Sequence, residues 1–190
     1  MRTRGKFGGW AAAKLIKMAG GYDRAKFGGV FTMDCYDADG NLKWSESAHN
    51  IVTNEGLDNI LEEYFKGSAY TALWHAVPID VITAPAAGDT YANTMSDANE
   101  EFIGYSEGTR QVWTPGTVSS ASVSNTAAKA TYSITATATI YGAAMVDTVT
   151  KGSAAAGILY CRADFASSRA VVNTDTLEIT YTVTSADDGV

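Results

Sequence analysis

The run Lys129-Ala-Thr-Tyr-Ser-Ile-Thr-Ala-Thr-Ala-Thr-Ile-Tyr141 alternates small polar and small apolar residues with a period close to two. It belongs to an almost charge-free stretch of Thr, Ser, Ala and Val that extends from Ser119 to Ile140. Successive side chains of a strand point to opposite faces of a sheet, so this alternation predicts a half-buried β-strand over residues 129–141.

Shorter segments with strand character lie on both sides of this run. They cover residues 30–36, 42–46, 71–83, 109–114, 143–150, 157–164 and 176–184, and Gly, Asn and Asp separate most of them. Short strands with turn signals between them are typical of sandwiches and jelly rolls. The sequence therefore predicts a mainly β fold, an antiparallel β-sandwich or jelly-roll-like domain over residues 30–190.

One amphipathic helix is predicted at about 54–66. Thr53 or Asn54 would cap it, and Gly67 would end it. Its apolar residues recur at helical spacing, so one face should cover a sheet or the end of a sheet: Leu57, Ile60, Leu61, Tyr64 and Phe65.

The charge of the chain is unevenly distributed. Residues 1–29 have a net charge of +6, although the whole chain carries -7. This segment predicts an extended basic N-terminal arm that docks on an acidic partner, or alternatively a solvated, disordered tail. The acidic body disfavours direct binding of nucleic acid. The candidate contact residues combine basic and aromatic side chains: Arg2, Arg4, Lys6, Phe7, Trp10, Lys14, Lys17, Tyr22, Arg24, Lys26 and Phe27.

The first predicted hairpin carries a weak metal-binding pattern. Asp37, Asp39 and Glu46 fit three positions of a calcium loop, but Cys35 stands where the first carboxylate ligand should be. A thiol is a poor ligand for calcium. A plain β-hairpin with an Asp-Gly turn is the favoured interpretation, and we expect no cofactor.

No catalytic constellation is apparent in the sequence. His49 and His75 are isolated, and Glu100 and Glu101 suggest an acidic surface rather than an acid–base pair. We therefore predict that the protein is not an enzyme. No run of eighteen apolar residues occurs, so no membrane segment is expected.

The two cysteines, Cys35 and Cys161, are far apart in the sequence and lie among strand-like residues. This placement favours two buried thiols over a disulfide.

Seven segments between residues 30 and 184 carry a family resemblance: Gly-Asn-Leu-Lys-Trp at 40–44, Asn-Ile-Val-Thr-Asn at 50–54, Gly-Leu-Asp-Asn-Ile-Leu at 56–61, Tyr-Ser-Glu-Gly-Thr-Arg at 105–110, Trp-Thr-Pro-Gly at 113–116, Ser-Val-Ser-Asn-Thr-Ala at 122–127 and Asp-Thr-Leu-Glu-Ile-Thr-Tyr at 175–181. Together they resemble small structural proteins of tailed bacteriophages, several of which are capsid cement or decoration proteins with β-sandwich or jelly-roll folds.

The resemblance implies a structural virion protein that binds the assembled phage head and stabilises it by bridging capsid subunits. The partner would be the phage major capsid protein. The protein would be made in the host cytoplasm and would sit on the capsid surface as a homo-oligomer, a dimer or a trimer. The basic arm lies outside the resemblance, and we expect it to act as an anchor.

The alternative is a tail or fibre component that binds a host receptor or glycan. Its contact surface would be the segment 84–108, through Tyr91, Phe102 and Tyr105.

Overall fold

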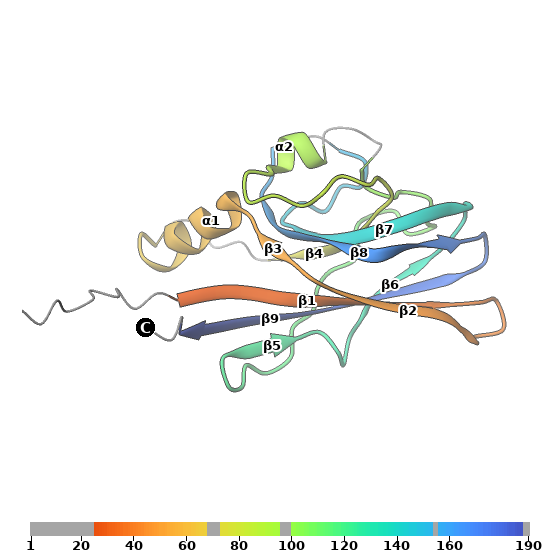
Figure 1. Ribbon diagram of the computed structural model, residues 1–190, viewed down its shortest axis with the longest axis horizontal. Helices are drawn as coiled ribbons and strands as arrows, with labels where there is room; N and C mark the ends of the chain where they lie inside the picture. Colours follow the sequence, from red (N-terminus) through yellow and green to blue (C-terminus); the bar gives the residue numbers. More distant parts are fainter. Residues whose placement is uncertain (1–24, 68–72, 96–99, 154–155, 188–190) are drawn as a thin grey trace, which may run out of the picture.

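A computed structural model of the chain describes residues 25–67, 73–95, 100–153 and 156–187. These residues form two stacked antiparallel sheets (Figure 1). The predicted mainly β, sandwich-like fold is therefore confirmed.

The first sheet, called the β9 sheet, has five strands in the order β2-β1-β9-β5, with β6 also paired to β9. Its strands are β1 (Ala25–Tyr36), β2 (Leu42–His49), β5 (Ser122–Ser124), β6 (Ala130–Ser133) and β9 (Thr176–Asp187). The second sheet, called the β8 sheet, has four strands in the order β3-β8-β7-β4. They are β3 (Ile51–Val52), β4 (His75–Ile79), β7 (Ala138–Val146) and β8 (Leu159–Val171).

The main core lies between the two sheets and follows the strand period of two. Phe31, Met33 and Cys35 alternate inward along β1, and Leu177, Ile179 and Tyr181 do the same along β9. Cys35 and Cys161 are both buried and free, which confirms the prediction of two buried thiols.

The alternating run 129–141 forms two strands, not the single strand that its period predicts. Its first part is β6 in the β9 sheet, and its last part opens β7 in the β8 sheet. Between them, buried Ile134 bridges to Tyr105, and the chain crosses from one layer to the other. Gly142, expected to separate two strands, lies inside β7, where it approaches the backbone of Ala163 too closely for a side chain.

Helix α1 (Asn54–Tyr64) begins at the predicted cap. The hydroxyl of Thr53 accepts a hydrogen bond from the Gly56 amide at 3.1 Å and donates one to the Leu159 carbonyl. Gly56 packs directly on β8: a Cβ at this position would clash with the carbonyl oxygen of Tyr160 and lie 2.9 Å from its Cα. The helix therefore contacts the sandwich through its first turn.

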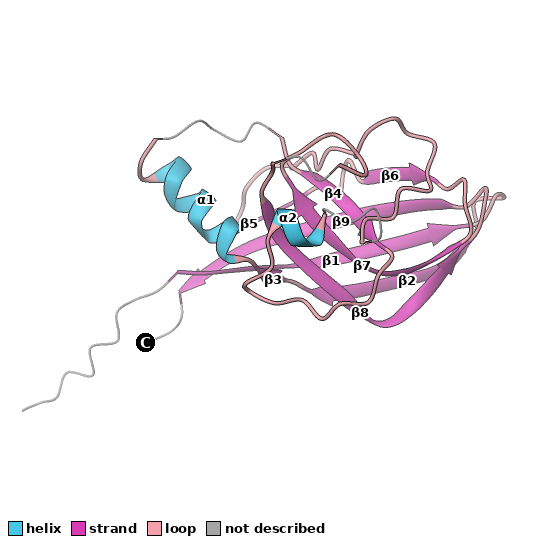
Figure 2. Cartoon of the chain, turned by 90° about the horizontal axis from the view of Figure 1, so that it is seen from above, coloured by secondary structure: helices cyan, strands magenta, loops and turns pink. Residues whose placement is uncertain are grey.

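The second helix, α2 (Tyr91–Thr94), lies over the β8 sheet, whereas α1 projects from the end of the sandwich (Figure 2). Among the residues that the structure describes, no helix is long and apolar enough to cross a membrane.

Two buried arginines hold Glu100 and Glu101, which lie in the predicted contact segment 84–108, against the body of the domain. Arg110 forms a bidentate ion pair with Glu101: its Nε donates to Oε1 at 2.8 Å, and its Nη2 donates to Oε2 at 2.7 Å. Both side chains are at most 1 % exposed. Arg162 contacts Glu100 at 3.2 Å and donates to the carbonyl of Thr83 at 2.8 Å. The expectation of an acidic surface at Glu100 and Glu101 is therefore wrong, because each carboxylate neutralises an arginine in the interior.

The close contact at Gly56 yields a test of how α1 is held. Gly56→Ala should lower the free energy of unfolding by about 1–3 kcal/mol, because the added methyl group must push α1 away from β8. Urea denaturation would measure the loss. Asp58→Ala, on the exposed side of the same helix, is the matched control and should change stability by less than about 0.5 kcal/mol. Equal losses in the two variants would contradict this account of the helix contact.

The carboxyl group of Asp80, which follows β4, predicts a pH-dependent stability. Burial, together with the nearby charge of Glu101, raises its pKa to about 6. A carboxyl pKa that rises on folding stabilises the native state below the unfolded value, and this contribution is lost as the pH rises through about 6.

Asp80→Asn should therefore be more stable than the unaltered protein at pH 7, by about 1 kcal/mol after allowance for partial solvent exposure. The difference should shrink towards zero near pH 4, where the aspartate is protonated. Thermal melts at the two pH values measure it, and a difference that does not change with pH would contradict the prediction.

Candidate docking cleft at the end of the sandwich

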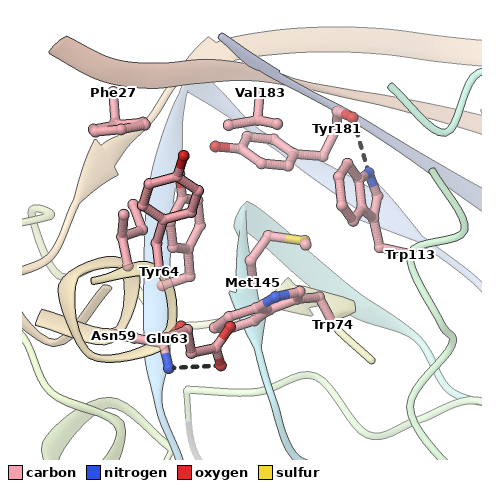
Figure 3. Close-up of a pocket in the computed structure, with 11 residues that line it drawn as sticks. Phe27, Asn59, Glu63, Tyr64, Trp74, Trp113, Met145, Tyr181 and Val183 are labelled. Carbon is pink, nitrogen blue, oxygen red and sulfur yellow. Dashed lines mark hydrogen bonds between the residues drawn. The ribbon is translucent and has the colours of Figure 1, made fainter. Parts of the chain in front are cut away.

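An aromatic cleft opens between the two sheets, beside α1 (Figure 3). Its volume is about 410 Å³, within the range of about 300–1,000 Å³ that is common for ligand sites. Eleven residues line it: Phe27, Asn59, Ile60, Glu63, Tyr64, Trp74, Trp113, Met145, Tyr160, Tyr181 and Val183. We refer to this set as the aromatic cleft.

The walls of the cleft come from different layers. Tyr181 and Val183 are two residues apart on β9, so they point to the same face, and Phe27 lies on the neighbouring strand β1. Met145 of β7 and Tyr160 of β8 face them from the other sheet. The cleft exists because side chains do not fill the space between the two sheets at this end of the sandwich.

Trp113 is fixed by its backbone and its ring. Its amide donates to the carbonyl of Trp74 at 2.7 Å, and its indole Nε1 donates to the carbonyl of Tyr181 at 2.9 Å (Figure 3). The ring of Trp74 is in turn 5.5 Å from that of Tyr160. These contacts form a pre-arranged aromatic wall.

The indole of Trp113 also completes the backbone pairing of β9. Strand β5 pairs with residues 182–184, and β6 pairs with residues 176–179. At the gap between β5 and β6, the side chain of Asn125 accepts a hydrogen bond from the Tyr181 amide at 2.8 Å and donates one to the Ile179 carbonyl at 3.1 Å. The indole of Trp113 donates a hydrogen bond to the Tyr181 carbonyl. Side chains therefore replace the missing strand.

Polar groups are few in the cleft. Asn59 donates to Glu63 at 3.1 Å, and Glu63 is the one carboxylate among the lining residues. Burial raises the pKa of the Tyr181 hydroxyl, so this group stays neutral. The arrangement can hold aromatic or aliphatic groups, but it offers no facing acid–base pair.

Helix α1 extends this apolar surface. Tyr64 is 82 % exposed and Phe65 is 73 % exposed, and Leu57 and Leu61 are exposed beside them. The expectation that the apolar face of the helix covers a sheet is therefore largely wrong. The helix is anchored at Gly56, so its last turn projects from the body. Of the five apolar residues at helical spacing, only Ile60 packs against the core.

The helix is also strongly acidic. Glu55, Asp58, Glu62 and Glu63 lie within it, and Asn54–Tyr64 contains no basic residue. The next residue but one, Lys66, forms an ion pair with Glu62 at 2.6 Å. The apolar cleft therefore lies beside a helix whose side chains carry a net negative charge.

The boundary predicted for the basic arm is wrong by five residues. Strand β1 begins at Ala25, because residues 25–29 pair with residues 183–187 of β9. Lys26 and Phe27 consequently belong to the sheet, and Phe27 lines the aromatic cleft. The other arm candidates lie outside the described residues: Arg2, Arg4, Lys6, Phe7, Trp10, Lys14, Lys17, Tyr22 and Arg24.

The plain hairpin predicted at residues 30–46 is confirmed. Asp37 accepts hydrogen bonds from the amides of Asn41 and Asp39, at 2.8 and 3.0 Å, and the Asn41 contact lowers its pKa. Glu46 forms an ion pair with Arg169 instead of approaching the turn. Across the described ranges, no three His, Cys, Asp or Glu side chains cluster as metal ligands would.

The three aromatic contacts predicted within residues 84–108 are wrong. Tyr91, Phe102 and Tyr105 are at most 3 % exposed. The hydroxyl of Tyr91 donates to the Ser153 carbonyl and accepts from Arg110, at 2.7 and 2.9 Å. These rings are part of the interior and cannot meet a partner.

The sequence matches no protein-family model and no curated protein.

The role of Trp113 is testable. Trp113→Phe keeps an aromatic ring but removes the donor to the Tyr181 carbonyl, which should cost about 1–2 kcal/mol of unfolding free energy. Trp44→Phe is the matched control, because it removes a similar bond to the Ala170 carbonyl at a more accessible place, where water can substitute. Chemical denaturation measures both. A loss in Trp44→Phe that equals the loss in Trp113→Phe would contradict the assigned role.

Proposed function

We propose that this protein is a structural component of a tailed-bacteriophage virion, a capsid cement or decoration protein. It binds the assembled head and stabilises it by bridging subunits of the major capsid protein. The observation that carries the proposal is the exposed aromatic and apolar surface at one end of the sandwich, formed by the aromatic cleft and the last turns of α1. A large exposed apolar patch on a soluble domain is typical of an interaction site.

The residues that carry the family resemblance support this proposal, because they build the frame of the domain. Thr53 caps the N-terminus of α1, and Gly56 allows the helix to pack closely on β8. Asn125 fills the gap beside β9, and Asp175 accepts from Lys43 at 2.5 Å and from the Val172 amide at 2.8 Å. Such residues preserve a shape, as a protein that holds other subunits in position requires.

The mechanism is linkage. A protein that binds only the assembled head lowers the free energy of that state and leaves the free subunits unchanged. The basic segment before Ala25 would supply attraction to acidic capsid surface, and the apolar end of the sandwich would supply buried area. Copies joined as a homo-oligomer would increase the avidity for the head.

The alternative, a tail or fibre component that binds a receptor or glycan, loses support because its three contact aromatics are buried. Copy number separates the two proposals. Quantitative protein analysis of purified particles should give hundreds of copies for a cement protein, and a handful would favour the tail component.

A head-binding experiment tests the contact surface. Leu61→Ser/Phe65→Ser should lower occupancy on heads that lack the protein by at least about tenfold, because each side chain would lose about 1.5–3 kcal/mol of burial. Deletion of residues 1–24 should also lower occupancy. The deletion must stop there, because residues 25–29 are part of β1.

Leu42→Ser is the matched control, since Leu42 is 56 % exposed and lies by the β1–β2 turn, at the far end of the sandwich. It should bind heads normally. Full occupancy by both the α1 variant and the deletion, with unchanged melting curves, would overturn the proposed contact surface.

A further inference from the structure

We propose that the aromatic cleft is the docking site for the protein's own N-terminal segment, residues 1–24, within the same chain. The inference concerns the free protein and does not depend on the proposed function, because Leu61 and Phe65, the side chains changed in the head-binding test, do not line the cleft. It combines the chemistry of the cleft, the charge of α1 and the point at which the described chain begins.

The cleft and the N-terminal segment are both rich in apolar side chains. The cleft is lined by aromatic and aliphatic side chains, and one of them, Tyr64, is 82 % exposed. Apolar surface of this kind is stabilised by removal from water. The N-terminal segment is rich in residues that could provide the cover: Phe7, Trp10, Leu15, Ile16, Met18 and Tyr22.

Helix α1 beside the cleft and the N-terminal segment carry opposite charges. Residues 1–24 contain six basic residues and one acidic residue, Asp23. Helix α1 carries four carboxylates and no basic residue. Glu62 pairs with Lys66 and Glu55 accepts from two backbone amides of the body, whereas Glu63 lines the cleft. Opposite charges around an apolar site favour and orient the bound segment.

The N-terminal segment is covalently joined to the chain close to the cleft. The described chain starts at Ala25, and Phe27, two residues later, already lines the cleft. Trp10 is fifteen residues before Ala25, and fifteen residues span at most about 50 Å, so the covalent connection allows Trp10 to reach the cleft. Because the segment belongs to the same chain, docking within one chain is favoured over docking between dilute chains.

Paramagnetic broadening in the full-length protein tests this inference. A nitroxide is attached through Ala12→Cys, because Cys35 and Cys161 are buried and burial raises the pKa of the Cys35 thiol to about 12. The methyl signal of Met145 and the indole N–H signal of Trp113 report on the cleft. Trp44, which pairs with Cys35 towards the other end of β1, is the distant reference.

The expected result is loss of more than half of the Met145 and Trp113 intensity, with the Trp44 signal retained. Glu63→Lys should weaken this broadening at least threefold. Asp39→Lys, the matched charge change in the β1–β2 turn, should leave it unchanged. High salt should also weaken the broadening, because it screens the attraction between the basic segment and Glu63.

Two results would overturn the inference. Equal intensities for Trp113, Met145 and Trp44 in a folded, labelled protein would show that the segment does not occupy the cleft. Spin-labelled chains without isotope can also be mixed with isotope-labelled chains that lack the nitroxide. Broadening in that mixture would show that the segment of a second copy is the occupant instead.

Discussion

Strand β9 is the element on which most of the structure depends. All twelve of its residues pair with β1 on one side, and on the other side it pairs with β5, β6 and the side chains of Trp113 and Asn125. A central strand must have its backbone groups satisfied along both edges. This requirement extends β1 back to Ala25, and it places Trp113 against Tyr181. Both consequences shape the aromatic cleft, so the candidate site follows from how one strand is completed.

The buried ion pairs have a different effect, because they decide which surfaces are available. Glu101 and Arg110 are removed from water together, and their two hydrogen bonds compensate the cost of burying charge. Tyr91 joins the same network through its hydroxyl. The segment 84–108 is thereby held against the β8 sheet, and its aromatic rings enter the interior. The exposed aromatic side chains of α1, Tyr64 and Phe65, lie instead at the end of the sandwich where the cleft opens.

The site has the character of a binding surface. Its walls are aromatic and aliphatic, and Glu63 is the one carboxylate among its lining residues. The acidic helix beside it and the basic segment before Ala25 have opposite charge, and the cleft lies within reach of that segment. Attraction and apolar burial can therefore act together on that segment.

The sequence by itself determined the fold class, the N-terminus of α1, the hairpin at Asp37 and the buried state of both cysteines. Each of these follows from local rules: a period of two, a capping hydroxyl, an Asp-Gly turn and the hydrophobicity of an isolated thiol. Only the tertiary structure decided that residues 129–141 divide between two sheets, that Glu101 is buried, and that Phe27, Trp113 and Tyr181 meet in one cleft. The physical reason is that periodicity assigns a side chain to a face, whereas burial and proximity depend on which distant strand covers that face.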